Sequence, residues 1–161
     1  MKIVADENLA FTDYFFSEFG DIQHRAGRTL SADDVKDADS LLVRSVTQVN
    51  EALLQNSSIK FVGSATIGTD HLDIAALEQH GIQWSNAAGC NAQAVAEYVI
   101  TALLQVRPEL LDANTTFTLG IVGLGNVGTR LAYMAKLLGW RVIGCDPFVQ
   151  REQVDQVEFH E

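Results

Sequence analysis

Three glycines in the second half of the sequence have the spacing Gly-x-Gly-x-x-Gly: Gly123, Gly125 and Gly128. An apolar segment, residues 118–122, precedes them, and an Ala/Leu-rich segment, residues 129–138, follows. In this context the first glycine permits a tight turn, the second lets the backbone approach a pyrophosphate, and the third lets a helix pack closely on a strand. The amides near Asn126 and Val127 would then lie at a helix N-terminus, where the helix dipole favours phosphate. The spacing therefore predicts a dinucleotide-binding site.

Asp146 follows the next apolar segment, residues 141–145. A carboxylate at this place accepts hydrogen bonds from the adenosine ribose hydroxyls and repels a 2′-phosphate, which favours NAD over NADP. The alternative is a glycine-rich turn without a ligand, in which Asp146 only begins a turn before Pro147. We favour the first interpretation because strand, helix, glycines and acidic residue occur together. Six residues are expected to contact NAD: Gly123, Gly125, Asn126, Val127, Gly128 and Asp146.

Short apolar segments alternate with amphipathic ones over residues 1–90. We expect strands at residues 2–5, 21–24, 40–44, 60–64 and 82–85. We expect helices at about residues 10–19, 31–36, 50–56 and 72–80, the last capped by Asp70, with Asp73 in its first turn, and ended by Gly81. Alternating strands and helices form a parallel sheet with helices on both faces. The pattern predicts a flavodoxin-like α/β domain over residues 1–90.

A longer helix is expected at residues 91–106, with Asn91 as its cap and Pro108 after its end. We expect residues 91–113 to form a bridging helix and linker between two domains. Residues 114–161 then hold one β-α-β unit, the start of a Rossmann dinucleotide-binding domain. One such unit cannot cover both faces of its sheet, so we expect residues after about 115 to be poorly stable by themselves.

The sequence carries 11 basic and 21 acidic residues, a formal charge of −10, and its basic residues are scattered singly. A protein with this balance repels nucleic acid, so we expect no such partner. The apolar runs are too short to span a bilayer, and the first residues form no apolar signal core, so we expect a cytoplasmic protein without a membrane partner. Cys90 and Cys145 have neither a metal-binding nor a disulfide spacing, and we expect no metal.

Ser45 and Thr66 each follow the carboxyl end of an expected strand, where open α/β sheets bind ligands. The loop of residues 65–69 is expected to offer unpaired amides to a carboxylate, beside a helix N-terminus. The hydroxyls of Ser45 and Thr66 would add donors, and Arg44 would supply positive charge for a phosphate. The alternative is ordinary capping of loops by small polar residues. From the residues alone, this alternative is the simpler one.

Several stretches carry a resemblance to a known family: residues 43–50, 64–73, 86–92 and 95–98. Together with a dinucleotide motif that begins only after a smaller α/β domain, they resemble the D-isomer-specific 2-hydroxyacid dehydrogenases. The resemblance covers essentially the whole chain. It implies that Ser45 and Thr66 contact the substrate and that Asn126, Val127 and Asp146 contact NAD. It further implies NAD-dependent oxidation of a phosphorylated 2-hydroxy acid to a 2-oxo acid, in a protein that is a homodimer at full length.

Oxidation of a secondary alcohol needs a base for the hydroxyl proton and a cation for the carboxylate. The resemblance implies that an Arg, an acidic residue and a His supply these functions, all from the later half of the dinucleotide domain. The sequence ends at Glu161, so we expect this chain alone to be inactive. We assign no catalytic role to its four histidines: His24, His71, His80 and His160.

Three other interpretations remain open. The first is a dehydrogenase of the same family with another substrate, such as 3-phosphoglycerate. The second is a non-catalytic NAD sensor, like some transcriptional co-repressors of the same fold. The third is a flavodoxin-like interaction domain with a degenerate tail. Ser45 and Thr66 favour an enzyme over a sensor, because a sensor would not need them. Failure of the full-length protein to bind NAD would favour the interaction domain.

Overall fold

The computed structural model describes residues 1–112, 114–149 and 157–159. The chain forms two compact units, unit 1 (Met1–Ala88) and unit 2 (Gly89–Glu161). Among the described residues, no helix is both long enough and apolar enough to cross a membrane.

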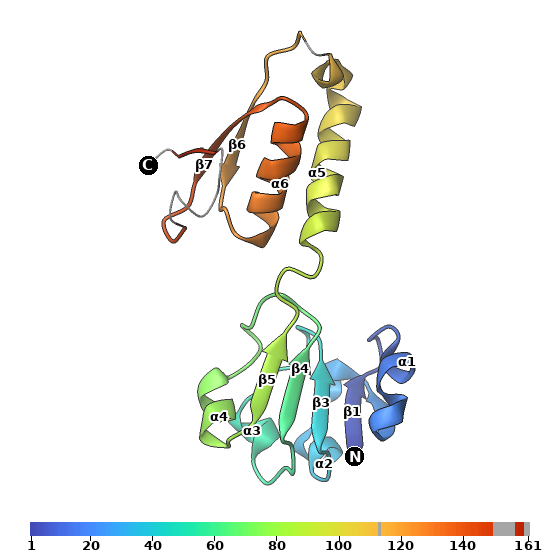
Figure 1. The fold of residues 1–161 in the computed structure, drawn as a ribbon. Helices are drawn as coiled ribbons and strands as arrows, with labels where there is room; N and C mark the ends of the chain where they lie inside the picture. The colour runs from blue at the N-terminus through green and yellow to red at the C-terminus, as the bar shows by residue number, and fades with distance from the viewer. Residues whose placement is uncertain (113, 150–156, 160–161) are drawn as a thin grey trace. The chain divides into compact units, whose positions relative to one another are not determined.

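Unit 1 is built on a sheet of five parallel strands (Figure 1). In chain order they are β1 (Lys2–Asp6), β2 (Asp21–Arg25), β3 (Ser40–Val43), β4 (Phe61–Ser64) and β5 (Gln83–Asn86). They lie side by side in the order β2-β1-β3-β4-β5. This is the flavodoxin-like order, so the α/β fold expected from the sequence is confirmed.

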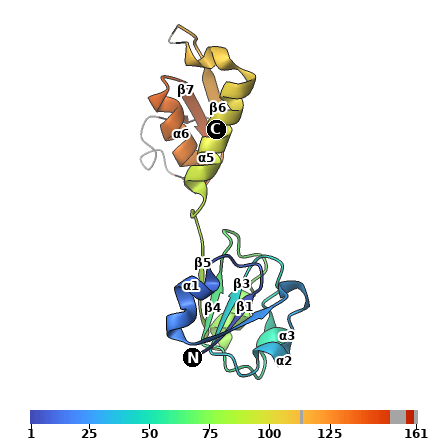
Figure 2. The same cartoon turned by 90° about the vertical axis from the view of Figure 1, so that its right-hand side faces the viewer.

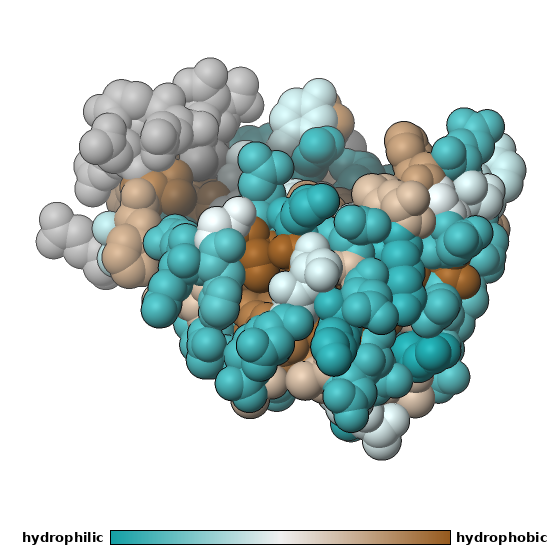
Figure 3. All heavy atoms as spheres, turned by 90° about the horizontal axis from the view of Figure 1, so that it is seen from below, coloured by the Kyte–Doolittle hydropathy of each residue, from teal (hydrophilic) through white to brown (hydrophobic). Residues whose placement is uncertain are grey.

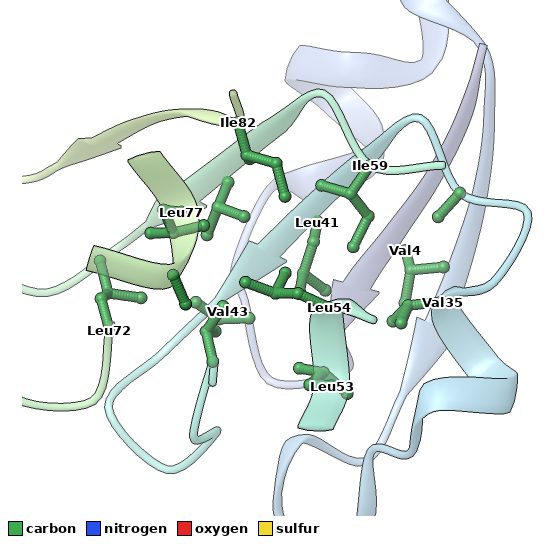
Figure 4. Close-up of a cluster of buried hydrophobic side chains, with 14 residues drawn as sticks. Val4, Val35, Leu41, Val43, Leu53, Leu54, Ile59, Leu72, Leu77 and Ile82 are labelled. Carbon is green, nitrogen blue, oxygen red and sulfur yellow. The ribbon is translucent and has the colours of Figure 1, made fainter. Parts of the chain in front are cut away.

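The larger hydrophobic core of unit 1 joins one face of this sheet to three short helices (Figure 4). The helices are α2 (Ala32–Val35), α3 (Glu51–Leu54) and α4 (Ile74–Gln79). Val4 and Leu41 of the sheet belong to this cluster, whereas Ile3, Ala5 and Leu42 form a separate one. Since successive side chains of a strand point to opposite faces, the two clusters lie on opposite faces of the sheet.

Helix α1 (Thr12–Phe16) lies on the opposite side of the sheet from α2 and α3 (Figure 2). The sequence predicted one helix over residues 10–19, but the chain continues after α1 as a 3₁₀ helix, η1 (Ser17–Phe19), and ends at Gly20. Gly20 has a φ of 157°, and a Cβ there would lie 1.8 Å from the carbonyl oxygen of Met1. Only glycine fits where the chain turns into β2.

The cap of α4 differs from the expected one. Asp73, not Asp70, is the N-cap: its Oδ1 accepts a hydrogen bond of 3.0 Å from the amide of Ala76. The helix begins two residues later than predicted because the preceding segment pairs with another loop, through the bridge between Val49 and Leu72. Asn91 does occupy the N-cap position of the long helix in unit 2, but its side chain makes no capping hydrogen bond.

Unit 2 contains a long helix, a β-α-β unit and a short third strand. Its elements are α5 (Ala92–Val106), η3 (Pro108–Leu111), β6 (Thr118–Val122), α6 (Asn126–Leu137), β7 (Arg141–Cys145) and β8 (Glu158–Phe159). The three strands are parallel, in the order β6-β7-β8, and α5 and α6 lie side by side (Figure 1). Ala96 and Ile100 of α5 share a core with Leu131 and Ala135 of α6. The expected bridging helix thus packs within unit 2. The sequence did not predict β8.

Hydrophilic residues cover most of the surface seen in Figure 3, with smaller hydrophobic areas between them. Four aromatic side chains on and beside α1 and η1 are 60% exposed or more: Phe11, Tyr14, Phe15 and Phe19.

Candidate functional site

Strands β3 and β4 are neighbours, and their last residues, Val43 and Ser64, pair in register. The amide of Ala65 donates a hydrogen bond of 2.9 Å to the carbonyl oxygen of Val43. The residues that follow, Ser45 and Thr66, therefore start from the same edge of the sheet. Ser45 is exposed and Thr66 is half-buried. The structure places both at the carboxyl edge, where the sequence predicted them.

Arg44 forms an ion pair with Asp6, the last residue of β1. Its Nε lies 3.2 Å from Oδ2 of Asp6, whose side chain is fully buried, whereas the Arg44 side chain is 35% exposed. The two atoms do not meet the geometry of a hydrogen bond, so charge attraction holds the contact. Asp6 thus neutralises part of the positive charge of Arg44. Asp6 was not predicted as a site residue, although an acidic residue that ends the apolar strand of residues 3–5 is a signal for a buried, paired charge.

Gly27 makes room for this ion pair. A Cβ at Gly27 would lie 2.3 Å from Oδ2 of Asp6 and 2.8 Å from Oγ1 of Thr47. The hydroxyl of Thr47 is buried and donates a hydrogen bond of 3.0 Å to the carbonyl oxygen of Gly27. The loop after β3 is therefore fastened to the loop after β2, and Arg44 and Ser45 lie in the fastened segment.

A chain of side-chain hydrogen bonds leads from Thr66 into the interior of unit 1. Oγ of Ser64 lies 2.8 Å from Oγ1 of Thr66 and 2.8 Å from Nε2 of His71. His71 is 5% exposed and precedes α4. Burial lowers the pKa of the His71 imidazole, and the nearby carboxylate of Asp70 partly opposes this shift. The neutral imidazole is thereby favoured.

Two carbonyl groups of the loop that follows β4 hold it in place by accepting hydrogen bonds. Those of Thr66 and Ile67 accept hydrogen bonds from the amide of Ala87 and from the side chain of Asn86. The amide of Ala65 donates to the carbonyl oxygen of Val43. The expectation of free amides across residues 65–69 is therefore wrong for Ala65. Within the described ranges, the amides of residues 66–69 donate to no backbone or side-chain group.

The glycine-rich loop of unit 2 joins β6 to α6. Gly123 has a φ of 91°, a left-handed conformation that favours glycine, and its amide donates to the carbonyl oxygen of Cys145. A Cβ at Gly128 would lie 1.9 Å from the carbonyl oxygen of Gly123. Helix α6 begins at Asn126, followed by Val127, with Gly125 as its N-cap. The structure thus has a tight turn, a close approach of helix to loop, and a helix N-terminus at the expected residues.

Asp146 ties this loop to the turn after β7. Its Oδ2 accepts a hydrogen bond of 2.7 Å from the amide of Leu124, and its Oδ1 accepts from the amides of Phe148 and Val149 at 2.8 and 3.2 Å. These backbone hydrogen bonds, that from Phe148 first, lower the pKa of the Asp146 carboxyl. A carboxylate has about four acceptor positions, so about one remains for a ribose hydroxyl.

In the described part of the chain, the other histidines and the two cysteines make no side-chain contact to these groups that the structure records. His24 contacts Asp13 and His80 contacts Glu51 at the surface, while His160 lies outside the described residues. Cys90 is exposed and Cys145 is half-buried, both as free thiols.

A cavity of about 320 Å³ adjoins the loop of residues 46–48, and a second of about 320 Å³ lies between α1 and the sheet. Neither is lined by Arg44, Ser45 or Thr66.

The chain belongs to the D-isomer specific 2-hydroxyacid dehydrogenase family, whose catalytic-domain model matches residues 6–158. It is 74% identical over 159 residues to an erythronate-4-phosphate dehydrogenase of Acinetobacter baumannii (strain AYE), covering 99% of this chain. It is 51% identical over 147 residues to an erythronate-4-phosphate dehydrogenase of Ectopseudomonas mendocina (strain ymp). The chain spans 45% of the length of the first relative and 39% of the second.

Solved structures of this family share the fold. A D-2-hydroxyisocaproate dehydrogenase matches 99% of this chain with a TM-score of 0.74 and 22% identity, over 57% of its own length. A D-lactate dehydrogenase from Aquifex aeolicus, in complex with NAD and lactic acid, matches 99% of the chain with a TM-score of 0.71 and 17% identity, over 55% of its length. These similarities agree with the α/β class and the parallel sheets of both units.

Proposed function

We propose that this chain supplies the substrate-binding and pyrophosphate-binding parts of an NAD-dependent dehydrogenase. Its substrate is 4-phospho-D-erythronate, which the full-length protein oxidises to 2-oxo-3-hydroxy-4-phosphobutanoate in the synthesis of pyridoxal 5′-phosphate. The observation that carries this proposal is the 74% identity to a relative named erythronate-4-phosphate dehydrogenase over nearly the whole chain.

The carboxyl edge of unit 1 has the donors that a doubly anionic substrate requires. The hydroxyls of Ser45 and Thr66 and the amides of residues 66–69 suit a carboxylate or a phosphate. Arg44 adds a positive charge that Asp6 neutralises only in part, since the guanidinium has five N–H donors and its Nε is the atom beside the carboxylate.

The glycine-rich loop of unit 2 suits the pyrophosphate of NAD. Gly125 lies open, because a Cβ built there would meet no atom within 4 Å, and the first amides of α6 follow it. Asp146 holds the loop at Leu124 and keeps a negative charge beside the place of the ribose, which disfavours the 2′-phosphate of NADP. NAD, when bound, accepts the hydride from the carbon that carries the substrate hydroxyl.

The chemical step also needs a base and a cation that we do not assign to this chain. The family resemblance implies an Arg, an acidic residue and a His from sequence beyond the part that this chain shares with its relatives. We therefore propose that this chain alone does not turn over substrate. We also propose that the full-length protein is a homodimer through its dinucleotide domain.

The test is NADH formation by the full-length protein with 4-phospho-D-erythronate and with 3-phosphoglycerate, each with NAD and with NADP. A higher kcat/KM for 4-phospho-D-erythronate with NAD is the expected result. A preference for 3-phosphoglycerate would keep the family chemistry and overturn the substrate. Binding of NAD without turnover of either acid would favour the sensor interpretation.

A further inference from the structure

We propose that Ser64 and His71 are positioning residues, which direct the hydroxyl proton of Thr66 toward an anionic oxygen of the substrate. This inference rests on the proposed function, because it places the substrate at Thr66. It assigns a role to a buried histidine and a strand serine that the sequence analysis left without one.

A single placement of the protons satisfies all three contacts of this chain at once. Oγ1 of Thr66 is 3.4 Å from the carbonyl oxygen of Gly68, which can only accept, so Thr66 donates there. Thr66 has one hydroxyl proton, so the 2.8 Å contact between Thr66 and Ser64 must use the proton of Ser64. Ser64 then has no proton left for His71, and its 2.8 Å contact with Nε2 requires a proton on that nitrogen. In this arrangement the chain donates from His71 through Ser64 to Thr66.

The last bond of the chain is the weakest. A hydroxyl commonly lies about 2.7–2.8 Å from its acceptor, and 3.4 Å is close to the limit of a hydrogen bond. An anionic oxygen beside Thr66 would accept the same proton at a shorter distance, because hydrogen bonds to charged acceptors are shorter and stronger. Thr66 is thus kept as a donor whose proton is available to a ligand.

Burial shields the hydrogen bonds of this chain from water. His71 is 5% exposed and Ser64 is also 5% exposed, so water does not compete for their hydrogen bonds. The lowered pKa of His71 favours a neutral ring, and in a neutral ring one nitrogen donates while the other accepts. With its proton on Nε2, the ring fixes the direction of both hydroxyls. In the reverse direction, Thr66 would donate to Ser64 and could only accept from a ligand.

The experiment compares substitutions in the full-length protein by steady-state kinetics with 4-phospho-D-erythronate and NAD. Ser64→Ala removes the relay, Thr66→Val removes the donor to the substrate, and the double variant removes both. Ser40→Ala is the matched control, because Ser40 is a buried serine on neighbouring β3 whose hydroxyl, among the described residues, hydrogen-bonds only to the sulfur of Met1. The KM for NAD and the thermal unfolding of every variant are measured alongside.

We expect Ser64→Ala to raise the KM for substrate about tenfold, as for the loss of one hydrogen bond to a charged group, with kcat and the KM for NAD little changed. Thr66→Val should raise the KM for substrate at least as much. The KM of the double variant should be no higher than that of Thr66→Val, because the two residues act as one donor. Ser40→Ala should leave the KM for substrate unchanged.

Two results would overturn the inference. The first is a KM for Ser64→Ala no different from that of Ser40→Ala. The second is a double variant whose KM is the product of the two single effects, which would mean that Ser64 acts without Thr66. An absence of turnover by the unsubstituted protein would instead defeat the proposed function. The two failures are therefore distinguishable.

Variants of His71 test the proton on Nε2. The amide nitrogen of Gln approximates the position of Nε2 and can donate there, whereas Phe fills the space without a polar group. We expect His71→Gln to keep a KM within about threefold of the unsubstituted protein and His71→Phe to approach that of Ser64→Ala. The reverse order would overturn the positioning role of His71. If His71→Phe does not fold, the kinetics of Ser64→Ala still decide.

Discussion

The buried carboxylate of Asp6 lies 3.2 Å from Nε of Arg44, across the boundary between neighbouring strands β1 and β3. Oδ1 of Asp6 also accepts a hydrogen bond of 2.8 Å from the amide of Asn8. One carboxylate thus fixes both the chain that leaves β1 and the arginine that directly follows β3. A group in this position affects stability and binding together.

Asp6→Asn keeps the size of the side chain and removes its charge. We expect a loss of about 1–3 kcal/mol in the free energy of unfolding, since Arg44 loses its buried partner but reaches water. We also expect a higher KM for the phosphorylated substrate, because the guanidinium is no longer held in one place. Denaturant unfolding and steady-state kinetics measure the two effects. Lys60→Ala, which breaks an ion pair whose lysine is 82% exposed, is the control and should change neither.

Gly27→Ala tests the space beside the ion pair. The new methyl would lie 2.3 Å from Oδ2 of Asp6, so either the loop or the ion pair must move. We expect a loss of about 1–3 kcal/mol in the free energy of unfolding, as in other overpacked sites. Gly120→Ala is the matched control, because a Cβ there meets only Ile143, at 3.8 Å. Equal unfolding midpoints for the two variants would contradict the packing described here.

The lowered pKa of His71 predicts how stability changes with pH. Between the folded pKa and the ordinary value of 6.5, the unfolded chain binds more protons than the folded one. The resulting stabilisation is present above 6.5 and is lost as the pH falls through this window. We expect the free energy of unfolding of the unsubstituted protein to fall more steeply below pH 6.5 than that of His71→Gln. Parallel curves for the two proteins would show that His71 does not titrate differently on folding.

Asp146→Ala tests the link between the glycine-rich loop and the turn after β7. The substitution leaves the amides of Leu124, Phe148 and Val149 without their acceptor and removes the charge beside the proposed ribose site. We expect the KM for NAD to rise about tenfold or more and the preference for NAD over NADP to fall. The control is Asp112→Ala, which removes a similar acceptor from the turn at Asn114. A KM for NAD as high in the control would contradict a specific role for Asp146.

The sequence predicted the strands of unit 1 closely, since each begins and ends within one residue of its expected position. Runs of β-branched and apolar residues bounded by polar ones are local signals. The start of α4, by contrast, is decided by a contact with a residue distant in the sequence. Asp70 and Asp73 are both suitable caps, and the choice between them follows from Val49, whose amide donates to His71 and whose carbonyl accepts from Asp73. These two bonds hold Leu72 against Val49 in a β-bridge, so the helix begins at Ile74.

The residues of the candidate site also divide into those with a local signal in the sequence and those without one. Ser45, Thr66 and the glycines were predicted because each follows an apolar strand in the sequence. Asp6, Ser64 and His71 were not, because their partners lie in other strands and loops, and only the folded sheet brings a buried carboxylate to Arg44 or an imidazole to Ser64. Interior polar groups are defined by long-range contacts, which periodicity does not reveal.

The loop after β3 is fastened at three points: Arg44 to Asp6, Thr47 to Gly27, and Val49 to His71. A loop held in this way loses little conformational entropy when a ligand binds, so it selects ligands by fit more than by adjustment. Engineering toward a bulkier hydroxy acid would therefore have to change side chains on a fixed backbone, because a loop anchored so often offers no alternative path. Directed evolution of this region should yield substitutions at exposed Ser45 before it yields insertions.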